Sequence, residues 1–278
     1  MRKVLLHPCS PRTLLLVIAA LLAMPASAAK YLDVTPPDLV RLLPSPPAND
    51  SPQTRSELDE LLQLQRERTP RDVDYARANI EIGVQQFAGA LGDEAGLKKA
   101  LPASVKSLFD AARADEKKLL DAAKMHFDRP RPVALDAHIQ PCLEPIVNMA
   151  YPSGHATWVF MTAVLLADMV PERREAIWAR AEDFARQRLV GGVHYRSDID
   201  AGRIAGTVIA AFMLASPSYR ADAAVAAADL RNFLKLHPPG DVLPRKVASS
   251  PGTPLAGVAV ARDLQWFETA VFAAPLAR

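Results

Sequence analysis

Residues 152–169 read PSGHATWVFMTAVLLADM, and this stretch decides the fold class. It opens with proline, serine and glycine, and apolar residues then dominate from 156 to 167. A run of about 12 residues falls short of the ~20 that a membrane-spanning helix needs. We therefore predict a helix over about 155–169 that is buried in a protein core.

The rest of the chain favours helices as well. A second apolar run of similar length covers 204–215, and it too is expected to be part of a core helix. No segment alternates apolar and polar residues in the manner of a half-buried strand, and the sequence contains no internal repeat. We predict an all-α fold, a single-domain helical bundle. Its further helices are expected at about 104–125, 172–189, 198–215 and 221–236.

Two amphipathic segments are predicted ahead of Gly92. Thr54 and Glu57 have the spacing of a capping box, so we expect the first helix to begin at Thr54. Between Val73 and Leu91, apolar residues recur at steps of three and four. This stripe predicts one helix that ends at Gly92.

The first 28 residues have the pattern of a secretory signal peptide. A basic start with Arg2 and Lys3 is followed by an apolar run over 14–22 and by small residues that end at Ala28. We expect cleavage after Ala28 and a periplasmic or secreted mature protein; the alternative is an N-terminal membrane anchor.

Prolines forbid long helices in two further segments. Six prolines lie between 34 and 52, and five lie between 127 and 154. The first segment is expected to be irregular and the second to form an ordered loop. The predicted domain organisation is a signal peptide (1–28), a proline-rich segment (29–53) and a helical domain (54–278).

Charge and cysteine content narrow the choice of partner. The formal net charge is +2, and three of the cations belong to the expected leader, so the remaining chain is nearly neutral. Such a balance indicates neither a nucleic-acid footprint nor a polybasic membrane surface. Beyond the expected leader, the apolar runs are too short to predict stable membrane insertion. Only Cys142 remains after cleavage, so the mature monomer can form no internal disulfide. We expect Cys142 to be a small buried apolar residue, with an intermolecular bridge as the alternative.

Two polar clusters in the loop region have the chemistry of a phosphate site. Lys124 and Arg131 bring positive charge from a helix end and a proline loop, and arginine can hold phosphate oxygens with two hydrogen bonds. Ser153 is a favourable helix cap, so the N–H groups of Gly154 and His155 are expected at a helix N-terminus, where anions bind.

A third cluster combines Arg188, His194 and Asp198. A histidine can act as a nucleophile when one ring nitrogen is free and the other is held by an acceptor. Asp198 lies four residues after His194 and can supply that acceptor. Gly191 and Gly192 would let the chain bend so that Arg188 and His194 face one pocket.

Other readings of these residues remain open. His194 and Asp198 also have the spacing of a structural pair on one helix face. Together with His155 they could bind zinc or iron, although three nearby cations favour an anion over a metal ion.

Together the clusters resemble the three-part signature of the type 2 phosphatidic acid phosphatase (PAP2) superfamily. This superfamily includes bacterial class A non-specific acid phosphatases and vanadium haloperoxidases. Lys124 with Arg131-Pro132 looks like the first motif, residues 152–155 the second, and residues 188–198 the third. One departure is visible, because the third motif usually begins Ser-Arg and here Gln187 precedes the arginine.

The resemblance implies a metal-independent acid phosphatase that needs no cofactor and hydrolyses small-molecule phosphate monoesters. By this resemblance His194 would attack phosphorus to give a phosphohistidine, and Asp198 would orient it. His155 would protonate the leaving oxygen and then activate water. The phosphate would be held by Lys124, Arg131, Arg188 and the backbone at Ser153 and Gly154.

The resemblance also implies an all-α fold of the PAP2/vanadium haloperoxidase type and a possible homo-oligomer. Lipid phosphates stay open as substrates, although the family's lipid phosphatases typically cross the membrane several times. A haloperoxidase that uses vanadate and a non-catalytic protein that binds phosphate-bearing ligands are the remaining alternatives. For a phosphatase, we expect a bell-shaped rate profile on the acid side.

Overall fold

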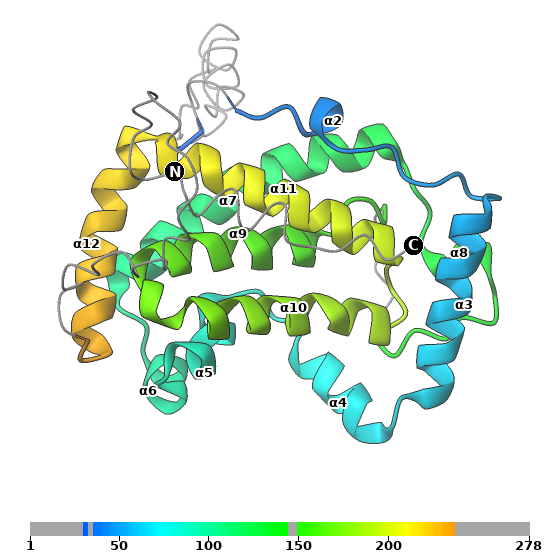
Figure 1. Cartoon of the computed structure of the whole chain (residues 1–278), viewed down its shortest axis with the longest axis horizontal. Helices are drawn as coiled ribbons and strands as arrows, with labels where there is room; N and C mark the ends of the chain where they lie inside the picture. Colours follow the sequence, from blue (N-terminus) through cyan, green and yellow to red (C-terminus); the bar gives the residue numbers. More distant parts are fainter. Residues whose placement is uncertain (1–29, 33–35, 144–148, 237–278) are drawn as a thin grey trace, which may run out of the picture. The chain divides into compact units, whose positions relative to one another are not determined.

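The computed structural model describes residues 30–32, 36–143 and 149–236 (Figure 1). Within these ranges all regular secondary structure is helical, which confirms the all-α prediction. The expected signal peptide and the stretch after residue 236 lie outside the described residues. Contacts along the chain separate residues 1–238 from residues 239–278, and the described residues all belong to the first unit.

Three helices form the centre of this unit, namely α9 (Gly154–Met169), α10 (Arg174–Val190) and α11 (Arg196–Ala215). Helix α9 is buried on all sides from Ala156 to Met169, apart from Asp168. It packs most extensively against α11 and next against α10. The predicted core helix in the opening stretch is therefore confirmed, and its uniform apolarity reflects neighbours on every side.

Small residues allow α9 and α11 to approach closely. A Cβ atom added at Gly202 would lie 2.6 Å from the Cβ atom of Ala156, and one added at Gly206 would overlap the carbonyl oxygen of Thr157. The first turn of α9 and the first half of α11 are thus fixed against each other. This contact matters because each helix carries site residues at its N-terminal end.

Two more helices complete the predicted set. The long α7 (Ala103–Phe127) packs against α12 (Pro217–Phe233), and a 3-10 turn, η2 (Pro171–Arg173), joins α9 to α10. Among the described helices, no single one is long and apolar enough to cross a membrane. Helices α11 and α12 pass that test only as a pair, bent by 93°.

The expected start of the first long helix is wrong. Helix α3 (Pro52–Glu67) begins two residues before Thr54, and Ser51 caps it by accepting a hydrogen bond from the Thr54 N–H group. Serine followed by proline is itself a strong helix start, because proline needs no N–H partner in the first turn. Glu57 therefore lies inside α3 and does not cap the helix.

The single helix expected between Val73 and Leu91 is also wrong. The chain forms α4 (Pro70–Ala78), leaves the helix at Asn79, and resumes as η1 (Val84–Phe87) and α5 (Ala88–Leu91). A capping box of Thr69 and Asp72 starts α4. The apolar stripe correctly marks buried residues, yet their spacing does not require one continuous helix.

The proline-rich segments contain little helix. Helix α2 (Leu39–Leu42) is a short helix within the first of them, and α8 (Pro132–Leu135) lies within the loop between α7 and α9. The remaining short helix, α6 (Glu94–Lys99), follows α5.

Candidate active site

The three polar clusters lie at helix ends. Lys124 is in the last turn of α7 and Arg188 in the last turn of α10. Ser153 caps α9, and Asp198 is in the first turn of α11. His194 lies in the short connection between α10 and α11. Because α9, α10 and α11 pack together, these ends lie around His194, which is close enough to Lys124, His155 and Arg188 to feel their charges.

His194 is fully buried, and both of its ring nitrogens have partners. Nδ1 lies 3.0 Å from Oδ2 of Asp198, and Nε2 lies 2.8 Å from Nη1 of Arg131. A guanidinium group can only donate, so Nε2 must be the unprotonated nitrogen, and Nδ1 donates its hydrogen to Asp198. The lone pair that a nucleophile needs therefore points towards Arg131.

Local structure fixes the spacing between this histidine and its acceptor. Gly192 adopts a left-handed conformation (φ 71°) just after α10, which turns the chain towards α11. The carboxylate of Asp198 also accepts from the backbone N–H group of Tyr195 at 3.0 Å, so it caps α11 and binds His194 with the same oxygen. The predicted four-residue spacing is thus realised across the start of a helix.

Lys124 and Arg131 are held by backbone carbonyl groups. Nζ of Lys124 donates to the carbonyl oxygen of Met149 at 2.7 Å, and Nη1 of Arg131 donates to that of Val193 at 2.7 Å. Burial and the neighbouring Arg131 lower the pKa of Lys124 to about 7. Burial lowers the pKa of Arg131 to about 10. Positive charge is therefore concentrated in a dry site.

The segment that follows α4 holds the remaining cation and the second histidine. Nη2 of Arg188 donates to the carbonyl oxygens of Ala76 at 3.2 Å and Asn79 at 3.0 Å. Nε2 of His155 donates to the carbonyl oxygen of Ile80 at 3.0 Å. This explains the break after α4, because a helix continued through Asn79 would use these carbonyl groups internally.

Burial lowers the pKa values of Arg188 and of both histidines. Burial lowers the pKa of Arg188 to about 10. Burial, and then the charge of Arg188, lowers the pKa of His155 to about 3. The pKa of His194 is also well below its ordinary value, through burial and the charges of Arg131 and Lys124. Both histidines are therefore neutral near pH 7 without a bound anion.

The second motif forms the start of α9 as expected. The Ser153 side chain accepts from the N–H group of Ala156 at 3.4 Å. The Ser153 N–H group itself donates to the main-chain oxygen of Asp198 at 2.9 Å. Gly154 and His155 supply the first N–H groups of the helix, for which a helix has no internal acceptor. A Cβ atom at Gly154 would meet Leu120 at 3.0 Å.

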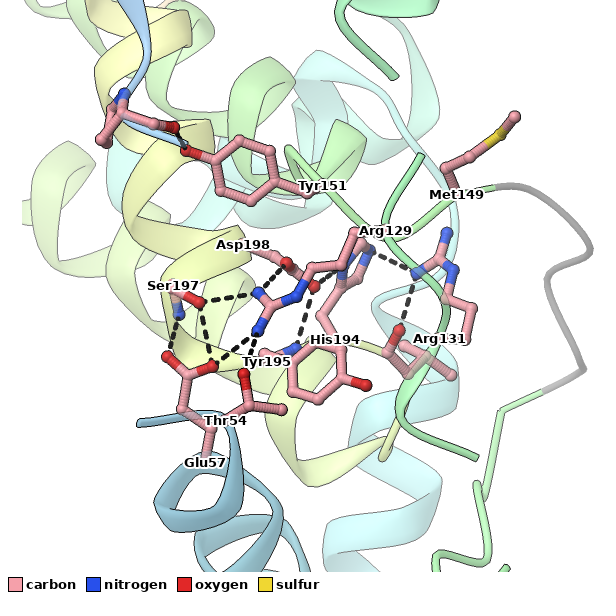
Figure 2. Close-up of polar contacts among 12 residues, drawn as sticks. Thr54, Glu57, Arg129, Arg131, Met149, Tyr151, His194, Tyr195, Ser197 and Asp198 are labelled. Carbon is pink, nitrogen blue, oxygen red and sulfur yellow. Dashed lines mark hydrogen bonds and ion pairs between the residues drawn. The ribbon is translucent and has the colours of Figure 1, made fainter. Parts of the chain in front are cut away.

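Arg129 and Glu57 were missed as site residues by sequence reasoning. Arg129 is buried, and its Nη1 atom lies 2.7 Å from Oδ1 of Asp198 (Figure 2). Its Nη2 atom donates to Oε2 of Glu57 at 3.0 Å. The available signal was Arg129-Pro130-Arg131-Pro132, in which two arginines occupy equivalent positions two residues apart.

Two residues singled out in the sequence lie beside the site. Gln187, which replaces the usual serine, is buried and donates to Oδ1 of Asp183 at 3.0 Å within α10. Cys142 is half-buried and packs against a small apolar cluster that includes Leu143 and Val190. Its backbone N–H group donates to the carbonyl oxygen of Gly191 at 3.1 Å, which helps to hold the turn before His194.

The alternative of a zinc or iron site finds no support in this geometry. Among the described residues, no three His, Cys, Asp or Glu side chains are grouped so that they could hold a metal ion. His155, His194 and Asp198 do not form such a group. The basic side chains around them suit an anion.

Comparison with known proteins agrees with the motifs. Residues 118–222 match the model of the PAP2 superfamily. The chain is 28% identical over 185 residues to the non-specific acid phosphatase of Salmonella typhimurium. The matched region covers 64% of this chain and 74% of that protein.

Two solved structures also resemble the chain. One is a transmembrane PAP2-type phosphatidylglycerolphosphate phosphatase from Bacillus subtilis, with a TM-score of 0.46 and 16% identity over 64% of this chain and 89% of that one. The other is a bacterial vanadium-dependent iodoperoxidase, with a TM-score of 0.49 and 20% identity over 63% of this chain. The match spans 52%, about half, of the iodoperoxidase chain.

The fold and the site together are those of a helical protein with a buried histidine beside a group of cations, and its relatives are named acid phosphatases. Residues 118–222, which carry all three motifs, are similar to the PAP2 superfamily.

Proposed function

We propose that this protein is a secreted, metal-independent acid phosphatase that hydrolyses phosphate monoesters through a phosphohistidine at His194. The observation that carries the proposal is the pair of contacts made by the two ring nitrogens of His194. Asp198 holds Nδ1 at 3.0 Å, and the lone pair of Nε2 points at the guanidinium group of Arg131, 2.8 Å away. These contacts support the assignment of His194 as the nucleophile and of Arg131 as the neighbouring anion-binding group.

The cations account for phosphate binding. Lys124, Arg131 and Arg188 each have a lowered pKa because they are desolvated, and the pKa values of Lys124 and Arg188 also fall because Arg131 is close. A phosphate dianion relieves this repulsion and accepts their hydrogen bonds together with those of the first N–H groups of α9. Binding energy thus comes from charge that is costly in the empty site.

The chemistry follows in two steps. Nε2 of His194 attacks phosphorus, the N–P bond forms, and the bond to the leaving oxygen breaks while His155 supplies its proton. Water then attacks the phosphohistidine, His155 takes a proton from it, and the N–P bond breaks. Asp198 stabilises the positive charge that His194 gains during attack.

His155 needs an extra proton for the first step. Its pKa of about 3 describes the ring beside Arg188 without a substrate. The negative charge of a bound ester acts in the opposite direction and raises this pKa, so substrate binding and protonation of His155 favour each other. The ester itself would bring His155 into its acidic form.

Two groups of the free enzyme define the pH profile. Burial raises the pKa of Asp198 to about 6, against the opposing charge of Arg129, and the pKa of Lys124 is about 7. Below the first value Asp198 loses the charge that orients His194, and above the second Lys124 loses the charge that binds phosphate. We expect kcat/KM to be bell-shaped with its maximum between these values, in mildly acid solution.

Hydrolysis of p-nitrophenyl phosphate in the presence of EDTA tests the proposal. Wild type should turn over the ester with chelator present, and His194→Ala should lose activity while it stays folded. His138→Ala is the matched control, because His138 is exposed and paired with Asp136. Loss of turnover with EDTA, or full activity in His194→Ala, would reject the mechanism.

The proposed location has its own test. Secretion is supported by the leader pattern of residues 1–28 and requires that the leader be removed. Amino-terminal sequencing of the exported protein should find Ala29 as the first residue. A chain that retains Met1 and remains in the membrane fraction would instead favour the anchor.

A further inference from the structure

The side of Asp198 that faces away from His194 is hydrogen-bonded as well as the side that faces it. Oδ2 of Asp198 accepts from His194 and from the backbone of Tyr195. Oδ1 accepts from Nη1 of Arg129 at 2.7 Å. Because each oxygen is bonded in a different direction, the carboxylate cannot rotate without breaking a charge-assisted hydrogen bond.

Arg129 is in turn fixed by its surroundings. Its Nη1 atom also lies 2.7 Å from the hydroxyl group of Ser197, and its guanidinium carbon lies 3.8 Å from the centre of the Tyr195 ring (Figure 2). The Arg129 side chain is 1% exposed. A planar cation stacked on a ring and bonded at its edge has one orientation.

Glu57 closes the network from a helix far away in the sequence. One oxygen of its carboxylate accepts from Nη2 of Arg129 at 3.0 Å and from the hydroxyl group of Ser197 at 2.9 Å. The other accepts from the backbone N–H group of Ser197 at 3.0 Å. Glu57 therefore ties α3 to the first turn of α11 and balances the charge of Arg129.

We propose that Arg129 is a positioning residue for the reaction and that Glu57 anchors it. The four side chains form one chain of contacts, Glu57–Arg129–Asp198–His194, of which only the last would touch the phosphoryl group. This inference rests on the proposed function, since it assigns Arg129 to the same histidine. It assigns different roles to the two neighbouring arginines, because Arg131 contacts His194 directly and Arg129 acts through Asp198.

The role makes a specific demand on pH dependence. The charged groups that act on Asp198 are Arg129, Arg131, Lys124 and His194, with Glu57 behind Arg129. Burial raises the pKa of Asp198, and the charge of Arg129 is the largest of the effects that lower it. Removing its charge raises the pKa of Asp198, so the acid limb of kcat/KM must move to higher pH.

Four variants test the assignment by kinetics. Arg129→Gln and Arg129→Lys should lower kcat by about 10-fold to 100-fold with KM nearly unchanged, because Arg129 does not contact the ester. Arg131→Lys should raise KM as well. Arg196→Lys is the matched control, because Arg196 also pairs α11 with α3, through Glu60, but is exposed and does not touch Asp198.

A measurement of the His194 tautomer tests the positioning role of Arg129 independently of phosphatase activity. Nitrogen-15 NMR of the His194 ring should show hydrogen on Nδ1 in wild type and in Arg196→Lys, and a loss of that single tautomer in Arg129→Gln. If wild type lacks phosphatase activity but Arg129→Gln still changes the tautomer, the positioning role stands and the proposed function falls.

The opposite results overturn the inference. If Arg129→Gln keeps the wild-type tautomer, kcat and acid limb, and only its melting temperature falls, Arg129 is structural. Should Arg129→Gln fail to fold, Glu57→Gln gives the answer, since it keeps the shape of the network and removes its anchoring charge. It should lower kcat less than Arg129→Lys does, and an unchanged kcat with an unchanged acid limb in both variants would reject the role.

Discussion

Arg129 and Arg131 are two residues apart, and they contact His194 and its carboxylate from different sides. Arg129 is bonded to the carboxylates of Asp198 and Glu57, so its charge is balanced within the protein. Arg131 donates to the carbonyl oxygen of Val193 and to Nε2 of His194, and it lies near the cation Lys124. In the proposed mechanism an anion binds on the Arg131 side of His194, and the Arg129 side supports the nucleophile.

The two sides are joined through one histidine and its carboxylate. Arg131 faces Nε2 of His194, the nitrogen proposed to attack, whereas Arg129 faces the oxygen of Asp198 that does not touch the ring. Chemical similarity and closeness in sequence therefore do not make the two arginines equivalent. The difference comes from the neighbours that each meets across the fold, and experiments that change one side only can break or sharpen this contrast.

The largest expected effect comes from Asp198→Asn, which removes the link between the sides. The amide keeps the shape but no longer stabilises a positive His194, and it permits the wrong tautomer. We expect kcat to fall by about 10⁴-fold. Sulfate should still bind, because the three cations remain. A kcat within ten-fold of wild type would show that His194 needs no carboxylate.

The next largest effect concerns the cationic side and its pH dependence. Lys124 is protonated below its pKa of about 7 and neutral above it, so affinity for an anion must fall as pH rises through this value. Calorimetry with sulfate, which stays a dianion across this range, should show about ten-fold weaker binding above the transition.

Lys124→Arg is the control for that measurement, because arginine keeps its charge. Sulfate affinity in this variant should change much less between pH 6 and 8. An equally steep loss in wild type and Lys124→Arg would assign the transition to another group.

A smaller effect is expected from a change at the contact between helices α9 and α11, which hold residues of the site at their N-terminal ends. Gly206→Ala places a methyl group against the backbone of Thr157, where α9 and α11 touch. Overpacking of this kind costs about 1–3 kcal/mol of the free energy of unfolding. Gly89→Ala is the matched control, since a Cβ atom there meets only Glu94 at 3.8 Å. Equal stability of the two variants in urea would show that the close approach of the helices is not required.

The smallest effect is expected at Gln187, the departure from the usual third motif. Its amide bonds to Asp183 within α10. Gln187→Ser should leave kcat and KM within about two-fold and change the free energy of unfolding by about 1 kcal/mol, the value of one hydrogen bond. A large gain in kcat would mean that a serine hydroxyl supports the site after all.

Sequence reasoning reached the fold class and the position of Ser153 at a helix start because both depend on local patterns. The apolar run over 156–167 could only be a buried helix, and Ser153 had the chemistry of a helix cap. The spacing of His194 and Asp198 allowed a compact turn, which the structure contains. These inferences required no knowledge of which helices would pack together.

The misread elements depended on tertiary contacts. Glu57 had the spacing of a capping residue, but it bonds to Arg129 and Ser197, which are distant in sequence. The stripe from Val73 to Leu91 suited one helix, but the carbonyl groups near Asn79 instead bind Arg188 from α10. In both places a polar partner supplied by another helix outweighed the local pattern.

The measurement that tests the central claim most directly is trapping of the phosphorylated enzyme. A labelled phosphate ester would be mixed with wild type, and turnover stopped in base, where phosphohistidine survives and acyl phosphates do not. Peptide mass spectrometry should then find the label on His194, and no label in His194→Ala. A phosphate attached to another residue, or active turnover with no covalent species on His194, would contradict the account.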